Sequence, residues 1–136
     1  SELIDVIAKN KKIDRNIHLA VQSGDDQVLK RMNRWYTAKE YVVLVRKIKS
    51  KIKGAQISTD IIVGFPGETE KQFQNTIKLC KQANFIYGYI SKYSSRPNTA
   101  ATKAFQDDVS HVEKDRRFEI LDQLINSNNN PRTAVH

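Results

Sequence analysis

The sequence is poor in cysteine. Its 136 residues include only Cys80, so the chain cannot form an internal disulfide bond or hold a metal cluster through its own cysteines alone. The helical pattern IKLCKQANF predicts that Cys80 is a buried core residue, with a reactive thiol as the alternative. Because so little cysteine also fits a reducing compartment, we expect the protein to be cytoplasmic.

Long apolar runs are also lacking. No stretch reaches the about 18 apolar residues that mark a transmembrane helix. The first residues, SELIDVIAKNKK, contain neither the apolar segment nor the small-residue cleavage site of a signal peptide. We therefore expect no membrane partner.

Negative charge is in deficit. The chain has 23 Lys and Arg against 15 Asp and Glu, a net charge of +8, and the excess gathers in residues 9–15 and 45–53. A basic balance favours polyanionic partners, and RNA is the main candidate. We predict RNA contacts at Lys47, Lys49, Lys51 and Arg96. The alternative for the lysine-rich helix is an ordinary solvated surface.

Strand and helix patterns alternate along the chain. Strands are predicted at 17–21, 55–63 and 86–94, and helices at 1–9, 23–33, 37–54, 69–83 and 111–127. This order predicts an α/β fold with three consecutive parallel βα units in one domain, residues 1–127, followed by a disordered tail, 128–136. A closed (β/α)8 barrel needs about 250 residues, so the chain forms either a small open sheet or a piece of a larger barrel.

Capping and periodicity specify the helices further. Thr37, with Glu40 three residues later, predicts a capping box, Gly54 a helix end, and Thr69 another N-cap. The inward-facing residues of the last helix are predicted to be Val112, Phe118, Leu121, Leu124 and Ile125.

Unusual residues follow each predicted strand. They are Gln22, Ser23 and Gly24 after the first; Asp60 and then Gly64, Phe65, Pro66, Gly67 and Glu68 at the second; and Tyr93, Ser94, Ser95, Arg96 and Pro97 after the third. Because ligands of parallel α/β folds gather at the carboxyl ends of strands, we expect these residues to share one rim.

The stretch STDIIVGFPGETE concentrates glycine and proline in a chain with only five glycines and three prolines. Gly64 permits close approach of the backbone, and Pro66-Gly67 fits a type II turn. The stretch is either a backbone platform for a flat ligand or an ordinary strand-to-helix turn. It contains no nucleotide-binding GK[ST] or GxGxxG motif.

Several polar residues raise the question of a partner. Asp60, inside an apolar strand, needs either a ligand hydroxyl or amine, or a lysine or arginine of this chain. Gln22 and Arg34 can face one crevice, although Arg34 could instead interact with a helix C-terminus. We expect His18 to pack within the sheet rather than act as a general base.

Three stretches together resemble the second half of the radical-SAM domain of tRNA methylthiotransferases, the MiaB-like family. They are IHLAVQSGDDQVLKRMNRWYTAKEY, STDIIVGFPGETEKQF and KYSSRPNTAA, in the family's order and spacing, within about residues 1–126. The segment KYSSRPNT is more similar to the tRNA branch than to the branch that modifies a ribosomal protein.

The resemblance implies that the chain is a fragment of a partial (β/α)6 barrel. It implies two [4Fe-4S] clusters, one of which, on a CxxxCxxC loop, cleaves S-adenosylmethionine (SAM) to a radical, while the second takes part in sulfur donation. The implied reaction adds a methylthio group to isopentenylated or related adenosine beside the anticodon of tRNA, and a TRAM domain helps to hold the tRNA.

The resemblance also implies a SAM pocket. Gln22 and Arg34, twelve residues apart, match a pair of SAM contacts, and Asp60 matches a position near the methionyl or ribose part. The predicted cofactor-binding set is Gln22, Ser23, Arg34, Asp60, Gly64, Phe65, Pro66, Gly67, Glu68 and Ser94.

The chain departs from the family at several points. It lacks a CxxxCxxC motif, it has Ser and Asn in YSSRPNT where Pro and Gly are usual, and Trp35 replaces a charged residue. We therefore expect a fragment that is inactive alone and binds no cofactor tightly. We also expect no catalytic or metal-ligating residue within it.

Its expected partners are tRNA and the missing N-terminal half of the same protein, with self-association possible through an open sheet edge. The alternatives are a basic RNA-binding α/β module without catalysis, and a radical-SAM methylthiotransferase acting on a ribosomal protein.

Overall fold

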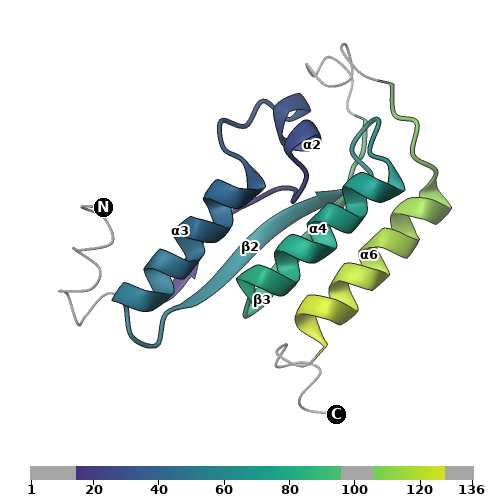
Figure 1. The fold of residues 1–136 in the computed structure, drawn as a ribbon. Helices are drawn as coiled ribbons and strands as arrows, with labels where there is room; N and C mark the ends of the chain where they lie inside the picture. The colour runs from purple at the N-terminus through teal and green to yellow at the C-terminus, as the bar shows by residue number, and fades with distance from the viewer. Residues whose placement is uncertain (1–14, 96–105, 128–136) are drawn as a thin grey trace.

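The protein folds around a three-stranded parallel sheet (Figure 1). The computed structural model describes residues 15–95 and 106–127. The strands are β1 (Asn16–His18), β2 (Gln56–Val63) and β3 (Tyr87–Lys92), with β2 in the middle. The predicted parallel sheet of three βα units is thus confirmed. The helix predicted at 1–9, the tail at 128–136 and Arg96 lie outside the described residues.

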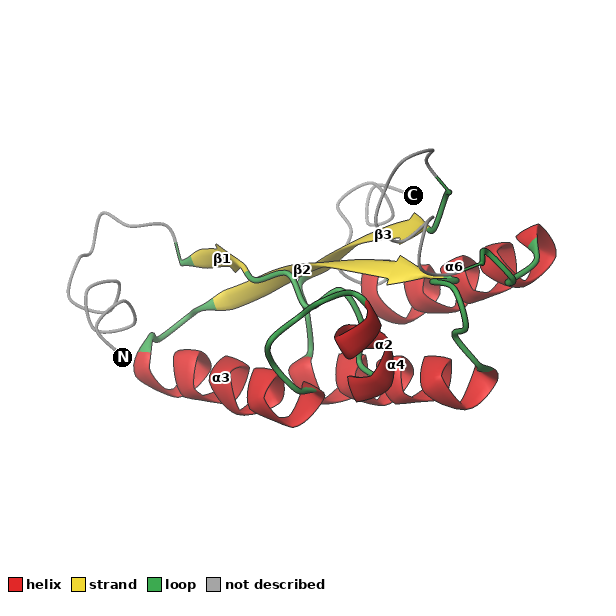
Figure 2. Cartoon of the chain, turned by 90° about the horizontal axis from the view of Figure 1, so that it is seen from above, coloured by secondary structure: helices red, strands yellow, loops and turns green. Residues whose placement is uncertain are grey.

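The helices alternate with the strands. They are α2 (Asp26–Arg31), α3 (Ala38–Lys51), α4 (Glu70–Ala83) and α6 (His111–Asn126). Figure 2 shows the three long helices α3, α4 and α6 on one side of the sheet, and no described helix covers the other side. The sheet therefore has one covered face and one open face. None of the described helices is long and apolar enough to cross a membrane.

Capping residues set the starts of α3 and α4. Thr37 accepts a hydrogen bond from the Glu40 backbone N–H while the Glu40 side chain accepts from Thr37, so the predicted capping box is confirmed. Thr69 is the N-cap of α4, as predicted, and it forms a capping box with Gln72, which the sequence analysis did not name. The C-terminus of α3 differs from the prediction, because the helix ends at Lys51 and Gly54 turns the chain with a φ of +79° beyond it.

The core lies between the sheet and the helices. On β2, Ile57, Thr59, Ile61 and Val63 are buried, and the residues between them are only partly buried. This alternation belongs to a strand covered on one face, whereas a nearly continuous apolar run like that of residues 61–63 is typical of a parallel strand covered on both. The helices contribute Tyr41, Val42, Val45, Ile48, Ile52, Phe73, Leu79, Cys80, Leu121 and Ile125 to this core. Burial raises the pKa of the Cys80 thiol to about 12, in keeping with a core residue.

The buried face of α6 is more polar than its sequence pattern predicted. Leu121 and Ile125 are buried, but Val112 is 80% exposed and Leu124 is 38% exposed. Lys114, Arg117 and Asn126 take the inward positions instead. The reason is what α6 packs against: backbone carbonyls and carboxylates of the loops around β2 and β3, which only polar side chains can satisfy.

Asn126 links the end of α6 to β3. Its side-chain amide donates to the Gly88 carbonyl oxygen at 3.0 Å and accepts from the Gly88 N–H at 2.9 Å. Gly88 favours this approach, because a Cβ added there would lie 3.0 Å from Ile125 Cδ1 and would crowd that side chain. The strand backbone and the helix are therefore joined through one buried amide.

We predict that Asn126→Ala lowers the free energy of unfolding by about 1–3 kcal/mol, because it leaves the buried Gly88 N–H and carbonyl oxygen without their hydrogen bonds to Asn126. Urea denaturation of the variant and the parent chain measures the change. The control is Gln123→Ala, at an exposed position of the same helix, for which we expect a change within about 0.5 kcal/mol. Equal effects of the two substitutions would contradict the role assigned to Asn126.

Candidate functional site

The open face of the sheet carries a cluster of His18, Ser58, Asp60 and Tyr89. Strand register places His18 beside Ser58 and Asp60 beside Tyr89. The His18 ring is hydrogen-bonded through Nδ1 to Ser58 Oγ at 2.8 Å and through Nε2 to Asp60 Oδ2 at 3.0 Å. The centroid of the Tyr89 ring lies 5.8 Å from that of His18, in an edge-on arrangement. The open face thus presents an oriented polar cluster.

Asp60 is paired with a histidine, which was neither of the two kinds of partner that the sequence analysis considered. Its side chain is 44% exposed, and its partner is His18 rather than a lysine or arginine. His18 is a residue of β1 that contacts its neighbours in the sheet, as expected, but its side chain is 45% exposed rather than enclosed. Both side chains point to the open face, because they sit at alternate positions of neighbouring strands. The period-two pattern of β2, with polar Ser58 and Asp60 two residues apart, was the available sequence signal.

Gln22 lies beside Asp60 at the carboxyl end of the sheet. The Gln22 N–H donates to the Asp60 carbonyl oxygen at 2.8 Å, and the Ile62 N–H donates to the Gln22 carbonyl oxygen at 3.0 Å. Gln22 has a φ of +73°, which is uncommon for a residue with a side chain and marks a strained position. These bonds join the segment after β1 to β2, in agreement with the prediction that residues after the first two strands lie at one edge of the sheet.

Ser23 and Gly24 lie beneath this rim. Ser23 is fully buried, and its Oγ is 3.4 Å from Thr76 Oγ1 of α4. Gly24 donates its N–H to the same Thr76 oxygen at 2.9 Å, and a Cβ on Gly24 would lie 2.6 Å from Thr76 Cα. Both residues therefore serve the packing of the loop after β1 against α4.

The loop from Gly64 to Glu68, here called the GFPGE loop, is packed from within. Its Phe65–Glu68 turn has the predicted form, since Glu68 N–H donates to the Phe65 carbonyl oxygen at 2.9 Å and Gly67 has a φ of +80°. Gly64 has a φ of +75°, and a Cβ there would lie 2.4 Å from Lys114 Cγ. The space beside Gly64 is thus filled by Lys114.

Glu68 is the buried centre of this loop. Its Oε1 accepts hydrogen bonds from the Gly64 N–H at 2.9 Å and from Arg117 Nη1 at 2.8 Å. Burial raises the pKa of Glu68, and the hydrogen bonds from Gly64 and Arg117 oppose that effect. Arg117 also donates to the Glu68 carbonyl oxygen at 3.0 Å, so one guanidinium holds both the backbone and the carboxylate of the loop.

Lys114 performs the same task at the end of β3. Its Nζ donates to the Tyr93 carbonyl oxygen at 2.8 Å and to Asp107 Oδ1 at 2.9 Å. Lys114 and Arg117 together fix the second and third strand ends to α6. The sequence reasoning missed both residues, although their spacing of three on a predicted helix places them on one face. Ser94, directly after Tyr93, is exposed at this end.

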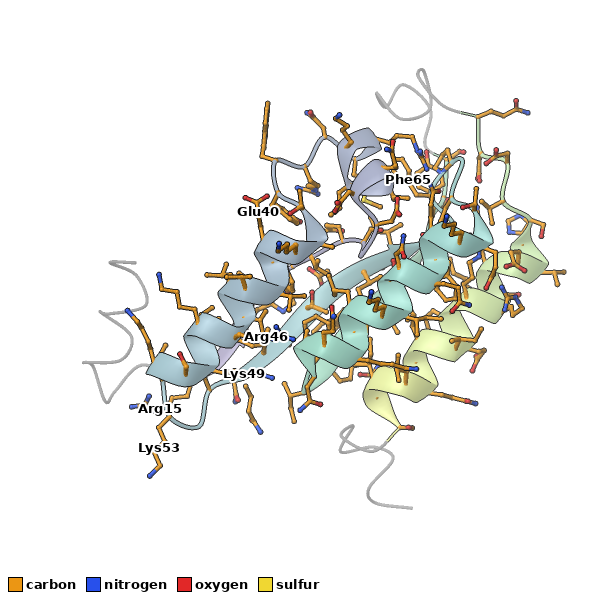
Figure 3. All side chains as sticks on the ribbon, in the orientation of Figure 1. Arg15, Glu40, Arg46, Lys49, Lys53 and Phe65 are labelled. Carbon is orange, nitrogen blue, oxygen red and sulfur yellow. The ribbon has the colours of Figure 1, made fainter. Side chains whose placement is uncertain are left out.

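The predicted RNA-binding lysines lie away from the rim. Figure 3 shows Lys53 and Arg15 at the end of the sheet opposite to Phe65. Lys47, Lys49 and Lys51 stand on the second half of α3, which runs toward that opposite end. Lys49 Nζ donates to the carbonyl oxygens of Ala83 and Asn84 at 2.8 and 3.0 Å, where it completes the C-terminus of α4.

Arg34 is exposed in the loop between α2 and α3. Its backbone N–H donates to the Leu29 carbonyl oxygen at 2.9 Å and closes the end of α2. This bond involves only the backbone, so the guanidinium stays available at the surface.

The described residues suit a polar ligand such as SAM but not an iron–sulfur cluster. Within the described residues, no group of three or more His, Cys, Asp and Glu side chains could hold a metal ion, and Cys80 is buried with a raised pKa. These residues do not suit an iron–sulfur cluster. A polar ligand with hydroxyl and amine groups does suit the open face, where the Asp60 carboxylate is oriented by His18.

Comparison with known proteins shows which family the chain resembles. Residues 1–80 match the profile of the Radical SAM superfamily. A tRNA-2-methylthio-N(6)-dimethylallyladenosine synthase of Thermotoga petrophila is 48% identical over 123 residues, which are 90% of this chain and 28% of that protein. A probable threonylcarbamoyladenosine tRNA methylthiotransferase of Methanocaldococcus jannaschii is 49% identical over 123 residues, again 90% of this chain and 28% of the relative. The chain thus spans roughly a quarter of the length of these relatives.

We predict that Arg117→Met destabilises the fold by about 3–5 kcal/mol, because it leaves the Glu68 carboxylate buried without its charged partner. The double variant Glu68→Gln/Arg117→Met should recover much of this loss, since neither charge then remains. Urea denaturation measures both. Arg116→Met is the control: this neighbouring arginine is about half-exposed, and its loss should change stability by about 1 kcal/mol or less. A loss at Arg117 no larger than at Arg116 would argue against the buried pair.

We also predict an acid-sensitive contribution from Glu113. The hydrogen bond from Arg116, helped by Arg117, lowers the pKa of Glu113 from 4.5 to about 2. Because the folded pKa is depressed, the stabilisation is fully present above pH 4.5 and is lost as the pH falls toward about 2. Unfolding free energies measured across this range should fall less steeply for Glu113→Gln. An unchanged slope would disprove the assignment.

Proposed function

Because the chain belongs to the Radical SAM superfamily, we propose that it forms part of the catalytic barrel of a tRNA methylthiotransferase. The observation that carries the proposal is the combination of this similarity with the polar cluster on the open sheet face. In a barrel of βα units, helices cover the outside and the bare side of the sheet faces the interior. The remaining strands of the barrel would then cover the open edges of β1 and β3.

We propose a SAM site at the carboxyl ends of the three strands, formed by Gln22, Asp60 and Ser94 together with Arg34 and the outer surface of the GFPGE loop. Support comes from the backbone bonds that join Gln22 to Asp60 and from the exposure of Ser94 and Arg34. Ser23 and Glu68 are buried and engaged with Thr76 and Arg117, so their part would be to hold the wall of the site.

Asp60 has the clearest role in such a site. His18 and Ser58 form a hydrogen-bonded row that fixes the Asp60 carboxylate on the open face. A carboxylate held in this way accepts hydrogen bonds from a ribose hydroxyl or an ammonium group without reorganising first. Bound SAM, cleaved reductively at a cluster held elsewhere in the protein, would supply the hydrogen-abstracting chemistry.

The proposed substrate is an adenosine of tRNA that carries a substituent on N6. The two relatives are named for dimethylallyladenosine and threonylcarbamoyladenosine, which share this feature. We propose that the chain alone lacks this activity, because a lone buried cysteine cannot hold the cluster.

The test uses the product of the complete reading frame that encodes this chain, reconstituted with iron and sulfide. We expect it to bind SAM and to add a methylthio group to N6-substituted adenosine in tRNA, detected by mass spectrometry of the nucleosides. Failure of the reconstituted protein to modify such tRNA would reject the proposal.

We predict that Asp60→Asn in this protein weakens SAM binding about tenfold or more, because a hydrogen bond to a charged group contributes roughly 1.5–3 kcal/mol. Equilibrium binding of SAM to the reconstituted protein measures the effect. Glu119→Gln is the matched control, since it makes the same acid-to-amide change at an exposed position of α6 and should bind SAM as the parent does. SAM binding by Asp60→Asn at the parent affinity would exclude Asp60 from the site.

A further inference from the structure

The loop between α2 and α3 carries Trp35, the only tryptophan of the chain. Its side chain is 92% exposed, more than any other large apolar side chain of the described residues. A tryptophan kept in water is costly, because its ring could bury more apolar surface than most other side chains.

The loop around Trp35 is firmly anchored on both sides. Before it, Asn33 adopts a φ of +62° and the Arg34 N–H closes α2 on Leu29. After it, the Tyr36 hydroxyl donates to the Val21 carbonyl oxygen at 2.9 Å. The loop is also tied to the start of α3, where Asp26 Oδ1 accepts from the Ala38 N–H at 2.8 Å. The ring is thus presented outward from a fixed backbone, which limits the ordering entropy lost when a ligand stacks on it.

Two cationic side chains lie near the ring. A shallow groove at this loop is lined by Gln27, Lys30, Asn33, Arg34 and Trp35, with Asp26 at its side. Lys30 and Arg34 are exposed, and neither side chain makes an ion pair or hydrogen bond within residues 15–95 and 106–127. The carboxylate of Asp26 is already engaged with Ala38. The groove therefore offers cations and an aromatic face together.

The position of this groove matches the rim of the sheet. The α2–α3 loop follows β1 and precedes α3, so it lies at the carboxyl ends of the strands. Figure 3 shows Glu40, in the first turn of α3, at the same end of the molecule as Phe65 of the GFPGE loop. The groove therefore lies at the same end of the strands as the proposed SAM site.

We propose that Trp35 stacks on an unpaired base of the RNA substrate and that Lys30 contacts a neighbouring phosphate. An exposed aromatic ring with flanking cations is the arrangement that binds single-stranded nucleic acid, since the ring stacks on any base and the cations follow the backbone. The inference deepens the proposed function and rests on its assignment of RNA as substrate. A protein partner could also bury the ring, and the test below distinguishes that outcome from binding of RNA.

The test measures the affinity of the complete protein for bulk tRNA labelled at its 3′ end, by fluorescence anisotropy over a series of salt concentrations. Trp35→Ala should weaken binding about 5- to 150-fold, and Trp35→Phe should retain most of the affinity, because a smaller ring still stacks. Lys30→Gln should reduce the salt dependence by about one phosphate contact.

Two control variants separate this site from general effects. Lys81→Gln removes the same charge from an exposed position in the last turn of α4, and Val112→Ala trims an exposed apolar side chain of α6. Both should bind tRNA like the parent protein. Circular dichroism and thermal melting of Trp35→Ala should match those of the parent, since the ring is 92% exposed.

The outcomes distinguish this inference from the proposed function. If Trp35→Ala binds tRNA as tightly as the parent protein does, the inference alone is wrong. Parent protein that binds no tRNA overturns the inference together with tRNA as the substrate. If Trp35→Ala instead abolishes self-association of the parent protein while tRNA affinity stays unchanged, the loop is a protein contact and the inference is wrong.

Discussion

The ion pair between Arg117 and Glu68 is the constraint on which the rim of the sheet depends. Both side chains are nearly inaccessible to water, and the carboxylate also receives the Gly64 N–H. A buried ion pair adds little net stability compared with apolar packing, but losing one partner is costly, so it enforces one arrangement of the loop. Lys114 occupies the space beside Gly64 and excludes any residue with a side chain there.

The consequence of this constraint is a fixed edge at the carboxyl ends of the strands. Two glycines with positive φ shape the GFPGE loop, yet the space beside Gly64 is filled by Lys114 of α6, and Arg31 of α2 lies beside Gly67. The polar groups that remain accessible come from the open face, where His18 orients Asp60, and from Gln22 beside it. The helix thus acts as the support, and the sheet presents the functional groups.

Charge is distributed between the two ends of the molecule in different forms. The second half of α3 carries a dense row of lysines at the amino ends of the strands, and one of them, Lys49, is engaged with the carbonyl groups that end α4. At the carboxyl end, Lys114 and Arg117 are buried in ion pairs, whereas Lys30 and Arg34 flank an exposed aromatic ring. Charge density by itself is therefore a poor guide to where RNA binds, because an ammonium group can equally complete a helix terminus.

Local patterns in the sequence determined the order of strands and helices, the capping boxes at Thr37 and Thr69, and the turn at Pro66-Gly67. These features depend on a few neighbouring residues, so periodicity and side-chain chemistry suffice to find them. Only the tertiary structure decided that α6 buries Lys114 and Arg117, and that Asp60 is paired with His18 across two strands. The contacts of Arg117 with Glu68 and of His18 with Asp60 join residues 49 and 42 positions apart in the sequence, and these partners follow from strand register and helix packing rather than from local composition.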